Sequence, residues 1–175
     1  LSISPLDGRY ASRVQPLTTE VSEYGLIRYR VMVEIKWLIK LANESHFREI
    51  PSFGEKAKAF LISLYENFSP EDAMAVKEIE KSTNHDVKAV EYWIKNQVKD
   101  HPELSASSEF THFTCTSEDI NNLSYGLMFK NTINEVVLPQ LNDVIGSMRK
   151  MAHEFAAIPM LSRTHGQPAT PTTLG

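Results

Sequence analysis

The sequence predicts an all-α protein, and three observations support this class. Apolar residues recur at steps of three and four in several long stretches, which is the spacing of one face of a helix. Stretches that alternate between apolar and polar residues, as half-buried strands do, are scarce. Only 7 glycines occur, none in the spacing of a dinucleotide-binding or phosphate-binding loop. We therefore expect packed helices.

The first long helix should follow a lead-in that is rich in turn-forming residues. Prolines and a glycine punctuate residues 1–17, so Arg9 and Tyr10 are expected on an extended or turn-rich segment. Residues 19–42 carry two neighbouring apolar stripes, which predict a helix packed on more than one side. A short helix is predicted around residues 57–64.

Ser69 marks the start of the next predicted helix. It suits the N-cap, with Pro70 at the first helical position and the acidic Glu71 and Asp72 in the first turn. This helix should run towards Thr83.

His85 belongs to a polar cluster, Thr83-Asn84-His85-Asp86, that begins a further helical pattern. A helix N-terminus has free N–H groups and the positive end of the helix dipole, which together favour an anion. In a purely structural interpretation, Thr83 or Asn84 caps the helix. Capping by these two residues does not account for His85.

A second histidine cluster consists of His112 and the sequence Thr116-Ser117-Glu118-Asp119. Thr116 is expected to be the N-cap of a helix, with Asp119 three residues later. The preceding residues 100–109 should form a connection, in which short helical turns are permitted.

Residues 137–155 carry an apolar seam at steps of four and three, which predicts a long helix packed lengthwise on other helices. Pro139 should kink or split this helix. Such a seam needs partners from further sequence or from other subunits. We expect an N-terminal helical domain at residues 1–113 and the start of a central helical bundle at residues 114–175.

The third cluster, Ser162 to Pro171, concentrates hydroxyl, guanidinium, imidazole and amide groups. Gly166, Pro168 and Pro171 exclude a long helix here, so an irregular segment is expected. A simple loop between helices would also explain this stretch. Three such clusters in one chain favour a small-molecule site.

Composition limits the function classes. The 175 residues are 42% hydrophobic, enough to bury a core, and the net charge of -4 with no Lys/Arg-rich block argues against a nucleic-acid surface. The single cysteine, Cys115, excludes an intrachain disulfide framework and favours the cytoplasm. No apolar run approaches the length of a membrane span, and the N-terminus lacks a signal-peptide pattern.

The clusters allow three kinds of chemistry. His85, His112 and His165 are not at helix-face ligand spacing, so a metal site would need tertiary convergence, and none is predicted. Hydroxyls at Thr116 and Ser117 are expected at a helix cap for structural reasons, which weakens nucleophilic catalysis. Acid–base chemistry with anion anchoring fits best, because histidine exchanges protons near neutral pH.

Together with Asp7-Gly8-Arg9-Tyr10, the three clusters closely resemble the adenylosuccinate lyase family of the fumarase/aspartase superfamily. The Thr-His-Gly-Gln element is shared with related lyases, whereas Thr83-Asn-His-Asp-Val-Lys-Ala-Val-Glu-Tyr is more specific. The resemblance covers essentially the whole chain.

The resemblance implies reversible β-elimination of fumarate from adenylosuccinate, giving AMP, and from SAICAR, giving AICAR. It implies no cofactor, nucleotide substrates, and a homotetramer whose sites each combine three subunits. In this family a base removes a proton from the succinyl carbon, and an acid protonates the departing nitrogen. The carbanion-like intermediate needs donors directed at the carboxylate where charge accumulates.

Through this resemblance, His165 matches the general acid, and Thr116 and Ser117 match residues that hold the succinyl portion. The remaining matches are substrate-binding or near-substrate positions. They are Arg9, Tyr10, Asn84, His85 and Asp86, with His112 and Gln167 as secondary candidates.

The chain departs from the family in one respect, because the serine base and its Ser-Ser-x-Met-Pro loop are absent. The resemblance therefore implies an N-terminal portion that is inactive by itself. Another fumarate-releasing lyase, such as an argininosuccinate lyase, and a noncatalytic protein on the same scaffold remain the alternatives. The sequence following Gly175 would distinguish the catalytic and noncatalytic interpretations.

Overall fold

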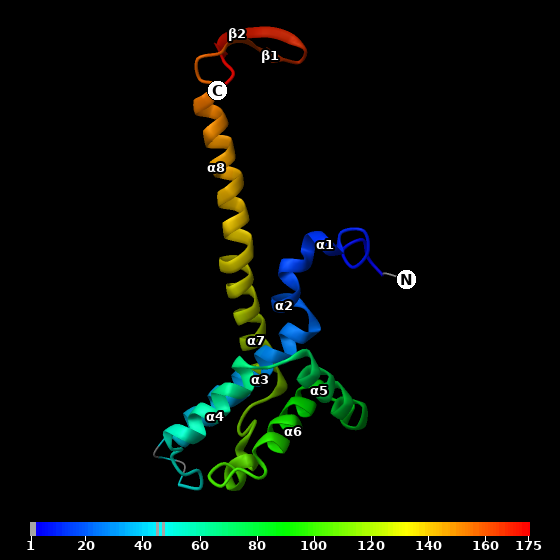
Figure 1. The fold of residues 1–175 in the computed structure, drawn as a ribbon, viewed down its shortest axis with the longest axis vertical. Helices are drawn as coiled ribbons and strands as arrows, with labels where there is room; N and C mark the ends of the chain where they lie inside the picture. Colours follow the sequence, from blue (N-terminus) through cyan, green and yellow to red (C-terminus); the bar gives the residue numbers. More distant parts are fainter. Residues whose placement is uncertain (1–2, 45, 47) are drawn as a thin grey trace. The chain divides into compact units, whose positions relative to one another are not determined.

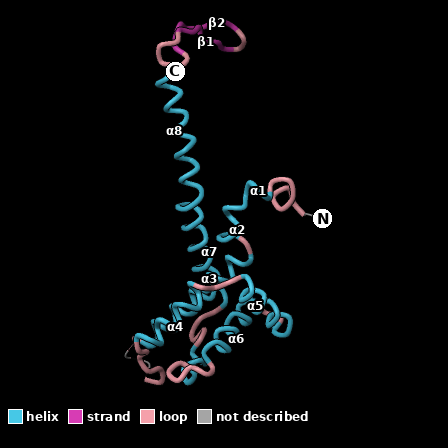
Figure 2. Tube along the Cα trace, in the orientation of Figure 1, coloured by secondary structure: helices cyan, strands magenta, loops and turns pink. Residues whose placement is uncertain are grey.

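The computed structural model describes residues 3–44, 46 and 48–175, and most of them are helical (Figures 1 and 2). The chain forms two compact units, Leu1–Thr132 and Ile133–Gly175. The predicted boundary between residues 113 and 114 separates two domains of the complete protein. The two units of this chain do not test that boundary, which stays a prediction. The helices of the first unit are α1 (Ala11–Val14), α2 (Thr18–Val21), α3 (Glu23–Ala42), α4 (Glu55–Glu66), α5 (Pro70–Thr83), α6 (Asp86–Val98) and α7 (Ser117–Thr132).

Helix α3 is the centre of the first unit. It contacts α2, α4, α5, α6 and α7, and its buried side chains lie on more than one face, as the two apolar stripes predicted. Ile35, Leu38 and Leu41 are almost completely buried, in one cluster with Trp93 and Ile94 of α6. Functional side chains that α3 presents are therefore held by a packed core.

The predicted helix at residues 19–42 is interrupted near its start. Ser22 is extended, and its Oγ accepts a hydrogen bond from the Gly25 N–H at 3.2 Å, which caps α3. A Cβ on Gly25 would lie only 2.4 Å from the Glu20 carbonyl oxygen, so the tight junction between α2 and α3 requires glycine. The lead-in is also more helical than predicted, because α1 and a 3₁₀ turn at Gln15–Leu17 precede α2.

The start of α5 is as predicted. Ser69 Oγ accepts from the Asp72 N–H at 3.2 Å, and the Asp72 carboxylate accepts from the Ser69 N–H at 2.9 Å. This reciprocal capping box satisfies two N–H groups that the helix leaves unpaired. The connection after α6 contains a 3₁₀ helix at Ser105–Phe110, which the prediction of a connection with permitted helical turns allowed.

The second unit contains α8 (Leu138–Glu154), preceded by a π-helical turn at Ile133–Val137. Pro139 is the second residue of α8, and the chain is helical without a break from the π-helical turn through the proline. The predicted split is therefore not seen, and the helix instead departs from α geometry just before the proline. The seam side chains Leu141, Val144, Met148 and Met151 are exposed in this chain.

The stretch predicted to be irregular is a β-hairpin in the structure, so this prediction was wrong. Strands β1 (Pro159–Thr164) and β2 (Gln167–Thr173) pair antiparallel. His165 and Gly166 form the two-residue turn, with φ of 49° and 75°, which is the backbone that tight hairpins require. Prolines are tolerated in β2 because both strands are edges. Within the described residues this hairpin is the only sheet, and the class remains all-α.

No helix of the described residues is both long and apolar enough to cross a membrane.

Candidate functional site

The core of the candidate site is the junction between α5 and α6. Asn84 ends α5 in the left-handed conformation, with φ of 50°, and its N–H donates to the Glu80 carbonyl at 2.8 Å. His85 follows in an extended conformation and caps α6, because its Nδ1 accepts from the Lys88 N–H at 3.2 Å. The structural interpretation placed Thr83 or Asn84 at this cap, whereas His85 is the residue that caps α6.

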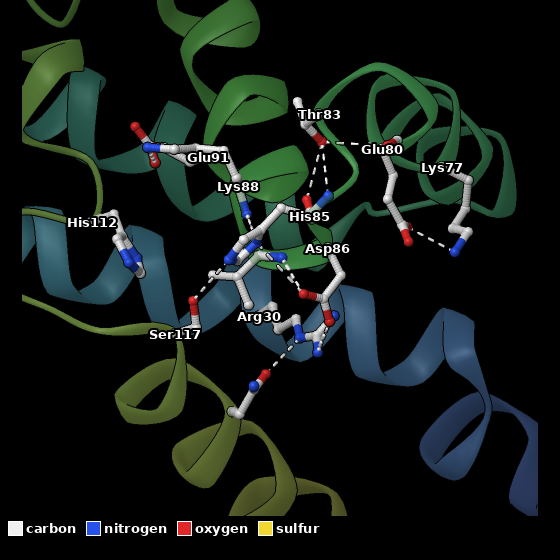
Figure 3. Close-up of polar contacts among 12 residues, drawn as sticks. Arg30, Lys77, Glu80, Thr83, His85, Asp86, Lys88, Glu91, His112 and Ser117 are labelled. Carbon is white, nitrogen blue, oxygen red and sulfur yellow. Dashed lines mark hydrogen bonds and ion pairs between the residues drawn. The ribbon is translucent and has the colours of Figure 1, made fainter.

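The capping hydrogen bond determines the tautomer of the His85 imidazole. Since Nδ1 accepts a backbone hydrogen bond, the neutral ring carries its proton on Nε2. Nε2 lies 3.5 Å from the Oγ of Ser117, the first residue of α7 (Figure 3). The starts of two helices that are distant in sequence therefore present polar groups to the same place.

Arg30 of α3 supports this junction, and the sequence analysis missed it. The residue is 5% exposed, and its guanidinium donates from Nη2 to Asp86 Oδ2 at 2.6 Å (Figure 3). It also donates from Nε to Asn121 Oδ1 at 2.9 Å. Burial raises the pKa of Asp86, but the Val87 N–H and the Arg30 charge outweigh it and hold the pKa below its ordinary value. Arg30 thus links α3 to the starts of both α6 and α7.

Asp119 organises the residues just before and within the first turn of α7. Its Oδ2 accepts from the Thr116 N–H at 2.8 Å and from the Thr116 hydroxyl at 3.1 Å. The backbone N–H of Thr116 is the main cause that lowers the pKa of Asp119. Thr116 thus stands at the predicted position directly before α7, with Asp119 as its partner. Its hydroxyl acts as a donor to Asp119 and not as the acceptor of a capping box.

His112 lies in the loop before α7 and is bound to a second buried charge of α3. Its Nδ1 is 2.6 Å from Oε1 of Glu34, a side chain with 0% exposure. Burial raises the pKa of the Glu34 carboxyl, and the hydrogen bond from His112 opposes this effect. His112 and Thr114 both have positive φ, 67° and 62°, which costs non-glycine residues about 1–2 kcal/mol each. Like Arg30, Glu34 was missed by the sequence analysis.

A signal for both residues was present in the sequence. Arg30 and Glu34 are four residues apart, so they lie on the same face of α3, inside a stripe of apolar residues. Charged residues at such positions are rarely fully buried unless they are paired. Two buried charged residues in the first long helix, each with a partner elsewhere in the chain, could therefore have been proposed as part of the site.

The other predicted residues belong to other segments of the chain. The Arg9 guanidinium stacks over the Tyr10 ring at 5.5 Å, in the turn before α1. No hydrogen bond or ion pair within the described residues joins Arg9 or Tyr10 to His85 or Ser117. His165 and Gln167 are exposed residues of the second unit, at the turn of the hairpin and the start of β2.

The assembled groups suit an anionic ligand and proton transfer. His85 presents Nε2 and Ser117 a hydroxyl at the start of α6, where the helix dipole favours negative charge. The nearby Lys88 ammonium is paired with the Glu91 carboxylate at 2.6 Å. Among the residues that the structure describes, no group of three or more His, Cys, Asp or Glu side chains could hold a metal ion.

Comparison with known proteins agrees with these features. A family model described as lyase matches residues 8–175. The chain is 52% identical over 174 residues to adenylosuccinate lyase from Vibrio cholerae, 51% to that from Haemophilus influenzae and 52% to that from Escherichia coli K12. Each match covers 99% of this chain and 38% of the relative. The chain therefore spans well under half the length of these relatives.

Proposed function

Because the chain belongs to the lyase family, we propose that it forms part of an adenylosuccinate lyase. The reaction is the reversible β-elimination of fumarate from adenylosuccinate, giving AMP, and from SAICAR, giving AICAR. The relatives, which are named adenylosuccinate lyase, support this choice of substrates. The observation in the structure that supports it most is the contact between His85 Nε2 and Ser117 Oγ.

In this proposal the groups around His85 bind the substrate. Ser117 and Thr116 hold the succinyl portion, where negative charge accumulates as the proton leaves. The Ser117 hydroxyl donates to a succinyl carboxylate, whereas the Thr116 hydroxyl must first release Asp119 to do so. Asn84, His85 and Asp86 form the cluster that binds the substrate and orients the histidine. Arg9 and Tyr10 contribute to nucleotide binding, and His112 and Gln167 lie near the substrate.

His165 is proposed to be the general acid that protonates the departing nitrogen. Its position at the tip of a two-residue hairpin turn supports this role, because the side chain is exposed and free to meet a site on another chain. No base is assigned to a residue of this chain. We further propose a homotetramer with composite sites and a cytoplasmic location.

The test is fumarate release by the full-length protein that carries this chain, followed by ultraviolet absorbance. Adenylosuccinate and SAICAR should both be cleaved, whereas argininosuccinate, offered at the same concentration, should not. Cleavage of argininosuccinate alone would replace this function by the related one. A protein that cleaves none of the three, yet is folded and tetrameric, would support the noncatalytic interpretation.

A further inference from the structure

Glu34 is a buried carboxylate to which the proposed function gives no role. Its side chain is 0% exposed, and its Oε2 has no hydrogen-bond partner within the described residues. Burying a carboxylate costs more free energy than a single hydrogen bond contributes. An apolar side chain of similar size would avoid this cost. The stability of the fold therefore does not explain a glutamate at this position.

The hydrogen bond that Glu34 makes is directed at the candidate site. Oε1 accepts from Nδ1 of His112 at 2.6 Å, so Nε2 is the ring nitrogen left for a ligand. Figure 3 shows the His112 imidazole directed towards the region that His85 and Ser117 also face. The His112 carbonyl accepts from the Cys115 N–H at 3.2 Å, which ties His112 to the residues directly before α7.

The loop that carries His112 is fixed to α3 at a second point. The indole Nε1 of Trp37 donates to the Phe113 carbonyl at 2.8 Å. Glu34 and Trp37 are three residues apart and so lie on one face of α3. This attachment holds a strained segment, since His112 and Thr114 on either side of Phe113 both have positive φ.

We propose that Glu34 is a positioning residue: its carboxylate holds the His112 imidazole through Nδ1, so that Nε2 faces the substrate. This inference rests on the proposed function, because it assumes that His112 lies beside a bound substrate. The proposed role makes a core residue, Glu34, part of the site. It also explains why a glutamate occupies this buried position.

The test uses the full-length protein with Glu34→Met, which keeps the volume but removes the acceptor, and Glu34→Gln, which keeps an acceptor oxygen. Glu34→Met should lower kcat/KM by about 10- to 100-fold, the range seen for second partners of functional histidines at metal sites. Glu34→Gln should recover most of this loss. A crystal structure of Glu34→Met without ligand should show the His112 ring turned away from its original orientation.

Two comparisons make the result specific to His112. In a His112→Gln background, neither Glu34 substitution should lower kcat/KM further, because the group that Glu34 positions is already gone. Glu91→Gln, which neutralises another buried carboxylate, should leave the orientation of His112 unchanged. The melting temperature of Glu34→Met should equal or exceed that of the unsubstituted protein.

Three outcomes would overturn the proposal: additive losses with His112→Gln, an unmoved His112 ring in Glu34→Met, or failure of Glu34→Met to fold. The last would show that Glu34 is needed for stability. If the unsubstituted protein releases no fumarate, the proposed function fails. The orientation of the ring in Glu34→Met still decides whether Glu34 positions His112.

Discussion

The Nε2 atom of His85 lies 3.5 Å from the Oγ atom of Ser117, although the two residues are separated by the whole of α6 and the connection after it. Each residue stands at the start of a helix, and Arg30 holds both starts from α3 through Asp86 and Asn121. The site is thus built where two helix starts meet a buried cation of a third helix.

Ser117 and its neighbour Thr116 should respond differently to substitution. The Ser117 hydroxyl contacts His85, so Ser117→Ala in the full-length enzyme should lower kcat/KM by about 10- to 100-fold, since a hydrogen bond to a charged group contributes about 1.5–3 kcal/mol. Its melting temperature should change little. Thr116→Ala should lose binding and also about 1 kcal/mol of stability, because its hydroxyl donates to Asp119. Kinetics and melting curves, with Thr116→Ser as the control, separate the two effects.

Arg30 should matter for stability in a pH-dependent way. Arg30→Met should lower the free energy of unfolding by about 1–3 kcal/mol at neutral pH, an amount reduced by the partial exposure of Asp86. The pKa of Asp86 is lowered in the folded protein, so its stabilising effect is present above the unfolded value near 3.8 and is lost as pH falls through the folded value. The difference between Arg30→Met and the unsubstituted protein should therefore shrink in acid, which urea titrations at pH 7 and pH 3 would measure.

A matched control for Arg30 is Asp86→Asn. If the pair acts as described, the double variant should be no less stable than Arg30→Met alone. A constant difference between pH 7 and pH 3 would contradict the assignment of the effect to the Asp86 charge.

The helices were more predictable than the site. Apolar periodicity and the N-cap residue Ser69 predicted α3, α5, α6 and α7, because helix formation in these segments depends on local spacing and capping. The hairpin was missed because its turn depends on left-handed φ at His165, which residue type does not reveal. Glu34 and Arg30 were missed because their partners, His112 and Asp86, are brought to them only by tertiary packing.

Cys115 should be slow to react although it is a free thiol. Burial raises its pKa above the ordinary value of 9.0, and the negative charges of Glu34 and Asp119 raise it further. A raised pKa means less thiolate at neutral pH, so alkylation should be slow near pH 7.5 and accelerate as the pH rises past 9. Iodoacetamide labelling followed by mass spectrometry, compared with the urea-unfolded protein, gives the rates. Equal rates in the two states at pH 7.5 would contradict this expectation.

Residues 1–175, expressed alone, should neither release fumarate nor remain a clean monomer. The expectation of inactivity rests on the absence of an assigned base, and that of association on the exposed apolar seam of α8. Light scattering should detect self-association, and a Leu141→Glu, Met148→Glu double variant should reduce it. Turnover by this piece would refute the composite-site proposal.

His165 provides the last test, because its proposed role separates catalysis from binding. Protonation of the departing nitrogen is required in the transition state and not for docking the nucleotide. His165→Ala in the full-length enzyme should therefore keep the oligomer and KM but lower kcat by about 10²- to 10⁴-fold. An exposed residue at a hairpin turn should be replaceable without loss of stability, so melting curves should be unchanged.

His85→Ala is the comparison for His165→Ala, and the structure adds a second consequence to it. Because His85 caps α6, its removal should disturb KM and kcat together and also lower the free energy of unfolding by about 0.5–2 kcal/mol. His85→Asn restores a cap acceptor without the imidazole, so it should recover stability but not turnover. If His165→Ala retains kcat and raises only KM, His165 is not the acid. In that case a loss of kcat in His85→Asn with an unchanged KM and normal stability would identify His85 as the group that exchanges the proton.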